Sequence, residues 1–179
     1  MYMRRLLAIL LLAGSTVTFF ACNKDNSLEK LRQNELKILE EYIDAHHPAA
    51  VPKPSGLYYF EKTQGSPEDT IKLGDRVQVF YATWRLDGAN DSTLVDQSSG
   101  YTDGHRFEPL EFIVGTNEVI SGLDEGITYM NLGTVGKLVI PSELAYGQNG
   151  SGSIGGFKTL LMEVEVYKLY PIEIPETEE

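Results

Sequence analysis

The chain has 179 residues, with 15 basic and 26 acidic side chains and a formal net charge of −11. This length suits a single domain with a small appendage. The charge argues against a nucleic-acid partner, because such binding depends on Lys and Arg side chains that neutralise phosphates. The sequence also lacks a basic run or a basic amphipathic face that would hold anionic lipid.

The first residues have the pattern of an export signal. Arg4 and Arg5 give a basic start, and a mostly apolar run follows over residues 6–20. This run is shorter than the roughly 20 apolar residues that a membrane-spanning helix needs. We therefore predict a cleaved signal peptide at residues 1–21, with an uncut single-span anchor as the alternative.

Cys22, which follows this signal, is the only cysteine of the chain. It has no partner for an internal disulfide, and no CxxC motif is present for metal or redox chemistry. The segment TFFAC, which ends at Cys22, resembles a bacterial lipobox, whose cysteine is acylated and becomes the mature N-terminus. The resemblance implies lipidation at Cys22 and a membrane partner through the lipid anchor. Because Asn23 follows the cysteine, we expect a lipid-anchored cell-envelope protein of the outer membrane.

A helix is predicted between this anchor and the main domain. Apolar side chains recur at helical spacing from Leu28 to Ile43, and the helix should end before Pro48. Residues 22–55 are thus predicted to be a lipid-anchored tether, a helix and a proline-rich linker. The pattern leaves open whether the helix packs on the domain, forms a dimer or acts as a spacer. The adjacent His46 and His47 lack supporting ligands, so no metal site is expected.

The remaining chain alternates strand patterns with one helical pattern, which indicates an α+β fold with a mostly antiparallel sheet. A hairpin signal occurs at Asp87-Gly88, and a polar loop is expected from there to about Leu94. A final acidic tail is predicted at residues 171–179. Strands are predicted at residues 57–62, 76–86, 110–114, 134–140 and 159–169, and a short buried helix at residues 118–130.

Several motifs in this region resemble, in order and spacing, those of FKBP-type peptidyl-prolyl cis-trans isomerases. They are GDRVQVFY at 74–81, Gly88, FIVG at 112–115, EVISGLDEG at 118–126, KLVIP at 137–141, LAYG at 144–147 and EVEV at 163–166. The resemblance implies an FKBP-like domain at residues 56–170. Its expected fold is a five- to six-stranded antiparallel sheet wrapped around a short helix, here with an extra N-terminal helix.

The resemblance also implies a substrate pocket. Taken singly, the apolar residues at these positions are core residues by default. The resemblance assigns catalytic positions to Tyr81, Asp96, Ile120 and Tyr146: Asp96 would pair with Tyr81 and face the twisted carbonyl, while the Ile120 N–H and the Tyr146 hydroxyl would donate to substrate carbonyls. It assigns substrate-binding positions to Val95, Leu110, Phe112, Val119, Leu123, Ile154 and Met162.

The expected activity is prolyl isomerisation that assists the folding of exported proteins in the cell envelope. No bond is broken in this reaction, so no cofactor or metal is expected. Proline-containing polypeptides are the implied partners, and macrolides are a candidate ligand class. Val95, Leu110 and Met162 stand where the family usually has aromatic residues, which predicts a looser pocket. A catalytically weak or inactive binding or chaperone lipoprotein is therefore the alternative, and a structural envelope lipoprotein with a vestigial pocket is a third interpretation.

Overall fold

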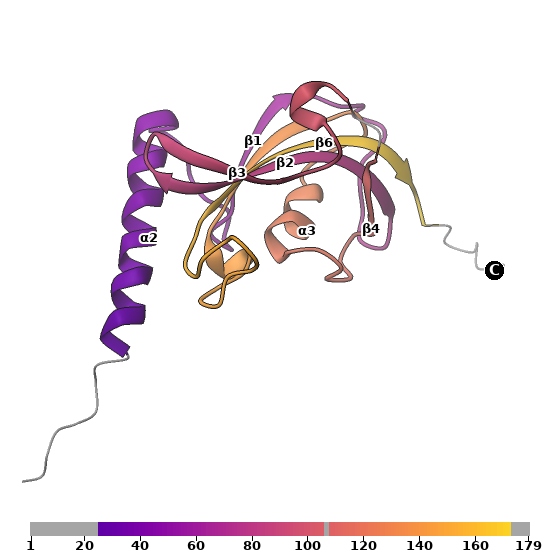
Figure 1. The fold of residues 1–179 in the computed structure, drawn as a ribbon. Helices are drawn as coiled ribbons and strands as arrows, with labels where there is room; N and C mark the ends of the chain where they lie inside the picture. Colours follow the sequence, from indigo (N-terminus) through magenta and orange to yellow (C-terminus); the bar gives the residue numbers. More distant parts are fainter. Residues whose placement is uncertain (1–24, 106–107, 173–179) are drawn as a thin grey trace, which may run out of the picture.

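A twisted antiparallel sheet and two helices form the fold of the computed structural model, which describes residues 25–105 and 108–172 (Figure 1). The elements in chain order are α2 (Asp25–His46), β1 (Tyr58–Thr63), β2 (Arg76–Gly88), β3 (Asp91–Gln97), the 3-10 turn η1 (Tyr101–Asp103), β4 (Leu110–Ile113), α3 (Ser121–Ile127), β5 (Val135–Ile140), the 3-10 turn η2 (Ser142–Leu144) and β6 (Leu160–Tyr170). The predicted signal peptide at 1–21, Cys22 and residues 173–179 of the predicted tail lie outside the described residues.

The sheet has six strands in the order β1-β5-β6-β2-β3, with β4 paired to the first half of β2. All pairings are antiparallel. Strand β2 is long enough to pair with β6 along one edge and with β4 and then β3 along the other. This arrangement confirms the predicted α+β architecture, with a six-stranded sheet and a short helix.

Side chains alternate between the two faces of the sheet and so fill two apolar cores. On β5, Leu138 and Ile140 belong to the core under α3, whereas Val139 belongs to the core under α2. On β6, Leu160 and Leu161 divide in the same way. This follows from the two-residue period of a strand. The two helices therefore cover opposite faces of one sheet.

Helix α2 packs on the domain, which answers a question that the sequence left open. Leu39, Tyr42 and Ile43 lie on one face, three and four residues apart, and are buried against the sheet. The Lys137 amino group donates to the Tyr42 hydroxyl at 2.7 Å. None of the helices in the described part of the chain is long and apolar enough to cross a membrane.

Helix α3 is shorter than the predicted span of 118–130. It begins at Ser121 because Asn117 has φ +59° and Ile120 has ψ 141°, so neither residue has helical geometry. The helix lies very close to β5. A Cβ at Gly122 would be 2.3 Å from the Ile140 Cγ2 atom, so only glycine fits there. The close approach brings the start of α3 against the sheet.

The polar loop predicted up to Leu94 is wrong, because strand β3 occupies Asp91–Gln97. The turn after Gly88 is short, and Gly88 pairs directly with Asp91. The strand is an edge strand whose residues are mostly exposed, so it lacks the apolar alternation that would have revealed it. Backbone pairing with β2 therefore defines β3.

Candidate active site

An open hollow of about 580 Å³ lies between the start of α3, strand β3 and the segment after η2. Its floor is apolar: Leu123, Leu160 and Met162 line it and are each less than 5% exposed. The other lining residues are Tyr81, Thr83, Asp96, Leu110, Asn117, Glu118, Val119, Ile120, Ser121, Ala145, Tyr146 and Ile154. The hollow therefore combines an apolar floor with polar side chains among its other lining residues.

A hydrogen-bonded pair stands at the edge of the hollow. The Tyr81 hydroxyl donates to the Asp96 Oδ2 atom at 2.8 Å. Tyr81 comes from β2, and Asp96 comes from β3, where it pairs with Thr83. The register then shifts, because Trp84 pairs with Leu94 and leaves Val95 as an extra residue. A bulge of this kind redirects neighbouring side chains, which explains how Asp96 reaches the hollow.

The backbone of Tyr81 is held by the segment that follows β3. Buried Ser98 accepts a hydrogen bond from the Tyr81 N–H at 2.9 Å through its hydroxyl oxygen. The Ser98 N–H in turn donates to the Tyr81 carbonyl at 2.9 Å. These bonds hold the backbone from which the Tyr81 side chain extends. Sequence reasoning missed Ser98, which forms no recognisable motif.

The pKa of Tyr81 is raised well above its ordinary value. Burial is the largest cause, and the hydrogen bond to Asp96, the charge of Asp96 and the neighbouring Tyr146 act in the same direction. A tyrosine with a raised pKa stays neutral and keeps its proton. Tyr81 therefore remains a hydrogen-bond donor throughout the neutral pH range.

The segment entering α3 is held by a buried carboxylate on that helix. Asp124 accepts hydrogen bonds from the Gly115 N–H at 2.7 Å and the Asn117 N–H at 3.3 Å. These bonds close the turn that leads to Val119 and Ile120 at the wall of the hollow. The Ile120 N–H donates to no group within residues 25–105 and 108–172.

Tyr146 also lines the hollow and is 38% exposed. The N–H groups of its two neighbours, Ala145 and Gly147, both donate to the Ser142 carbonyl, at 2.9 and 2.8 Å. Within the described residues, the Tyr146 hydroxyl forms no hydrogen bond, and its charge interaction is with Tyr81. Its side chain thus projects from a tightly folded segment.

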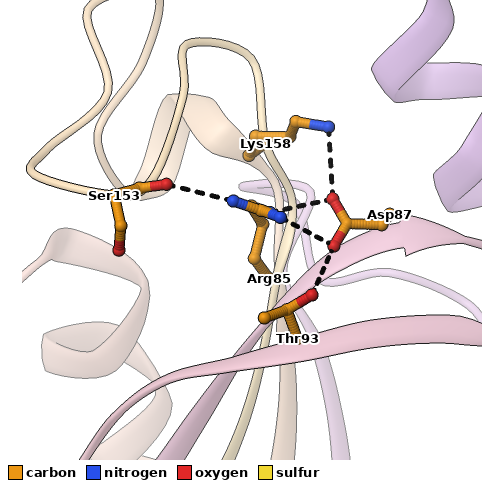
Figure 2. A network of polar contacts seen from close by, with 5 residues as sticks. All are labelled: Arg85, Asp87, Thr93, Ser153 and Lys158. Carbon is orange, nitrogen blue, oxygen red and sulfur yellow. Dashed lines mark hydrogen bonds and ion pairs between the residues drawn. The ribbon is translucent and has the colours of Figure 1, made fainter.

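The rim loop, defined as residues 148–157, closes one side of the hollow through Ile154. Figure 2 shows how the end of β2 holds it: the Arg85 Nη1 donates to the Ser153 carbonyl at 3.0 Å. Asp87 accepts two hydrogen bonds from Arg85, at 2.8 and 3.0 Å, and one from Thr93 at 2.8 Å. Lys158, just beyond the loop, forms an ion pair with Asp87 at 3.5 Å. Asp87 is therefore linked to the loop through Arg85, and to the residue that follows the loop through Lys158.

The structure places most of the predicted site residues around this hollow. Tyr81, Asp96, Leu110, Val119, Ile120, Leu123, Tyr146, Ile154 and Met162 all line it. Two predicted substrate-binding residues do not. Phe112 is 2% exposed and points into the core, and Val95 packs against that core from the bulge. Substrate binding by Phe112 and Val95 therefore stays a prediction.

Other lining residues were not predicted. They are Thr83, Asn117, Glu118, Ser121, Ala145 and Leu160. Thr83 follows from strand alternation, since it lies two residues beyond Tyr81 on the same face. Asn117 and Glu118 come from the turn before α3, which the sequence predicted to be partly helical. Within the described residues, no cluster of three or more His, Cys, Asp and Glu side chains is placed to hold a metal ion.

Comparison with known proteins shows the family to which this chain belongs. The family model described as FKBP-type peptidyl-prolyl cis-trans isomerase matches residues 68–167. The FK506-binding protein of Neisseria meningitidis serogroup C is 38% identical over 116 residues, which are 64% of this chain and 98% of that protein. The chain belongs to the FKBP-type peptidyl-prolyl cis-trans isomerase family.

Other relatives share only part of their length with this chain. The FKBP-type 22 kDa peptidyl-prolyl cis-trans isomerase of Escherichia coli is 38% identical over 135 residues, covering 75% of this chain and 59% of that protein. The human peptidyl-prolyl cis-trans isomerase FKBP10 is 35% identical over 69% of this chain, which spans only 19% of its length. The crystal structure of FkpA from Escherichia coli aligns with a TM-score of 0.65 at 33% identity, covering 82% of this chain and 64% of that one.

Proposed function

We propose that this chain is an active prolyl isomerase that rotates X-Pro peptide bonds in the hollow. The observation that carries the proposal is the open apolar floor of Leu123, Leu160 and Met162, with the Tyr81–Asp96 pair at its edge. A side chain filling this hollow would have favoured a vestigial pocket instead. Membership of the FKBP-type family supports the same activity.

Catalysis of this kind needs no reactive nucleophile. The barrier to amide rotation, about 18–20 kcal/mol, arises from resonance across the C–N bond. The planar amide separates more charge than the twisted one, so an apolar floor favours the twisted form. Binding the transition state more tightly than the ground state lowers the barrier, by about 1.36 kcal/mol for each factor of ten in rate.

The lining residues divide into two roles in this mechanism. Val119, Leu123 and Met162 would seat the proline ring against the floor. The Ile120 N–H and the Tyr146 hydroxyl would donate to carbonyls on either side of that ring. The Tyr81–Asp96 pair would face the carbonyl of the rotating bond.

A protease-coupled assay tests the activity. A short peptide with one X-Pro bond is cleaved only in the trans form, so an isomerase speeds the slow phase that follows the initial burst. We expect catalysis at submicromolar protein, and competition by FK506 if macrolides occupy the same hollow. Absence of any rate gain at micromolar concentrations of folded protein would contradict the proposal.

The second candidate function is binding or chaperone activity without efficient catalysis. It is favoured by Leu110 and Met162, which line the hollow at positions where the family usually has aromatic residues, and by Val95, which replaces a third. The position of Val95 in a bulge, packed against the core, leaves that part of the edge without a ring. Suppressed aggregation of an unfolded, proline-free client, together with an inactive peptide assay, would select this alternative.

The proposed setting is the cell envelope, where the protein would be held by acyl chains on Cys22 and assist the folding of exported proteins. Its support is the sequence pattern of residues 1–22, since acyl chains contribute about 0.8 kcal/mol per buried CH₂. In a bacterial host, labelled palmitate should be incorporated into the wild-type protein and not into Cys22→Ala. Fractionation should then recover the wild-type protein in the outer membrane. Equal labelling of both proteins would contradict lipidation at Cys22.

A further inference from the structure

Glu35 on α2 is a buried carboxylate that accepts hydrogen bonds from Arg32 of the same helix and from Ser142 and Thr159 beyond it. It is 3% exposed. Its Oε1 atom accepts hydrogen bonds from the Ser142 N–H at 2.7 Å and the Thr159 hydroxyl at 3.1 Å. Its Oε2 atom accepts from the Ser142 hydroxyl and the Arg32 Nη1, both at 2.7 Å. Helix α2 lies outside residues 68–167, the span of the family match.

Ser142 connects this carboxylate to the hollow. Glu35 holds the N–H and hydroxyl of Ser142, and the Ser142 carbonyl accepts from the N–H groups of Ala145 and Gly147. Those two residues flank Tyr146. The position of the Ser142 backbone therefore determines where the backbone lies on both sides of Tyr146.

Two further contacts tie the same segment to both helices. The Arg32 Nη2 forms an ion pair with Glu143 at 2.7 Å, which adds a second link from α2. The Ser121 hydroxyl, at the start of α3, donates to the Leu144 carbonyl at 3.1 Å. The segment that carries Tyr146 is thus held between the two helices.

Burying a carboxylate is energetically less favourable than burying an apolar side chain at a site where only packing is needed. Removing a charge from water is unfavourable unless hydrogen bonds and an ion pair compensate, and apolar residues often replace such groups without loss of stability. Hydrogen bonds differ from apolar contacts in fixing direction and register. Two of the four donors to Glu35 are the N–H and the hydroxyl of Ser142, in the segment that leads to Tyr146; the other two are the Thr159 hydroxyl and the Arg32 Nη1.

We propose that Glu35 is a positioning residue, through which α2 sets the placement of Tyr146 in the hollow. The inference rests on the proposed role of Tyr146 as a donor to the substrate. On this proposal α2 contributes to the activity of the domain, so residues that precede the matched family region would influence the rate of turnover.

A double-mutant cycle tests the coupling. Glu35→Ala should lower kcat/KM about fivefold or more in the wild-type background, and less than about twofold in the Tyr146→Phe background. The loss of stability caused by Glu35→Ala should be equal in both backgrounds, because it arises away from the Tyr146 hydroxyl. Equal loss of kcat/KM in the two backgrounds would overturn the proposal.

Two variants serve as matched controls. Glu40→Ala removes an exposed carboxylate from the same helix and should leave kcat/KM unchanged. Glu35→Gln keeps one oxygen for Ser142 and Thr159 and should recover activity to within about twofold of the wild type. Failure of Glu35→Gln to exceed Glu35→Ala would contradict the role of these hydrogen bonds. If Glu35→Ala does not fold, Ser142→Ala takes its place in the cycle, because it removes only the hydroxyl bond.

A structural readout separates this inference from the proposed activity. The ring signals of Tyr146, assigned by NMR through Tyr146→Phe, should shift in Glu35→Ala and stay in place in Glu40→Ala. If the shift occurs while the wild-type protein shows no isomerase activity, the proposed function fails and the positioning stands. If the Tyr146 signals are the same in all folded variants, the inference fails whatever the activity.

Discussion

The Tyr81–Asp96 pair places a protonated phenol and a carboxylate at the edge of an apolar floor. The raised pKa of Tyr81, caused first by burial and then by Asp96, keeps the hydroxyl a donor. The hydrogen bond at 2.8 Å fixes the direction of the carboxylate. Loss of the phenol proton is therefore not expected to limit activity at neutral pH.

We predict that Tyr81→Phe lowers kcat/KM by about two- to tenfold, because a net hydrogen bond contributes about 0.5–1.5 kcal/mol. The protease-coupled assay measures this change. Tyr59→Phe is the matched control: Tyr59 also meets a carboxylate, that of Glu61, but lies away from the hollow. Wild-type activity in Tyr81→Phe would show that the pair has no role in catalysis.

Asp87 in the rim-loop network gives a prediction for acid stability. The hydrogen bonds from Arg85 are the main cause that lowers its pKa below the usual 3.8. A carboxyl with a lowered folded-state pKa adds stability above its unfolded pKa and loses it as the pH falls through the folded value. The ion pairs of Asp87 should therefore stabilise the protein at neutral pH and cease to do so in acid.

The expected result is that Asp87→Asn lowers the free energy of unfolding at pH 7 by up to about 1 kcal/mol, as for other partly exposed ion pairs. The difference from the wild type should shrink below about pH 4, where the free carboxyl of the unfolded chain becomes protonated. Urea unfolding from pH 7 to pH 3 provides the measurement. A difference that stays constant over this range would exclude a contribution from the Asp87 charge.

At the scale of elements, the contact between α3 and β5 sets the depth of the hollow. Gly122 allows the helix to lie against Ile140, and Leu123, the next residue, forms part of the floor. A side chain at Gly122 would push the helix away from the strand. The contact of the helix with β5 and the floor of the hollow therefore depend on two adjacent residues, Gly122 and Leu123.

Gly122→Ala should reduce the free energy of unfolding by about 1–3 kcal/mol, the usual cost of overpacking a core. Chemical denaturation measures the loss. Gly155→Ala is the control, since a Cβ there meets nothing within 4 Å and the position has no positive φ. Equal stability of both variants would mean that α3 shifts freely.

The sequence predicted those elements whose side chains follow a regular burial pattern. Strands β2, β5 and β6 alternate apolar residues and were expected close to their observed bounds. Strand β3 was missed because backbone pairing alone defines it, and the start of α3 was misplaced because the backbone angles at Asn117 and Ile120 are not helical. Local composition does not encode either feature.

In the candidate site too, the sequence predicted features that local motifs carry and missed those that depend on contacts between distant segments. Motif order brought Tyr81, Asp96 and Tyr146 into one group, and the structure places all three at the hollow. The bulge that displaces Val95 and the link from Glu35 to Ser142 depend on contacts between distant segments. No spacing in the sequence reports such contacts.

The whole molecule is organised by one sheet with an apolar core on each face. Leu138 and Val139 are adjacent residues and belong to different cores. Loss of α2 would expose Val139 and Leu161 to water and remove the partners of Ser142. The helix, the sheet and the hollow should therefore form one cooperative unit.

Hydrogen exchange at increasing denaturant can test this cooperativity. The amides of Leu39 and Ile43 in α2 should exchange with a free energy within about 1 kcal/mol of that for Val164 in β6, as expected for a single cooperative unit. The exposed first turns of α2 should exchange faster through fraying. Detachment of the whole helix at low free energy, while β6 stays protected, would show that α2 is a separate unit.

The direction of α2 has a consequence for where catalysis would occur. Its N-terminal half runs beside the η2 turn, and its N-terminal end lies below the sheet in Figure 1, the side that also holds α3 and the rim loop. Cys22 precedes the first described residue, Asp25, by three positions. Acylation of Cys22, as proposed, would hold the side of the sheet that carries the hollow close to the bilayer, so the hollow would receive chains that reach the membrane surface more readily than chains that stay in solution.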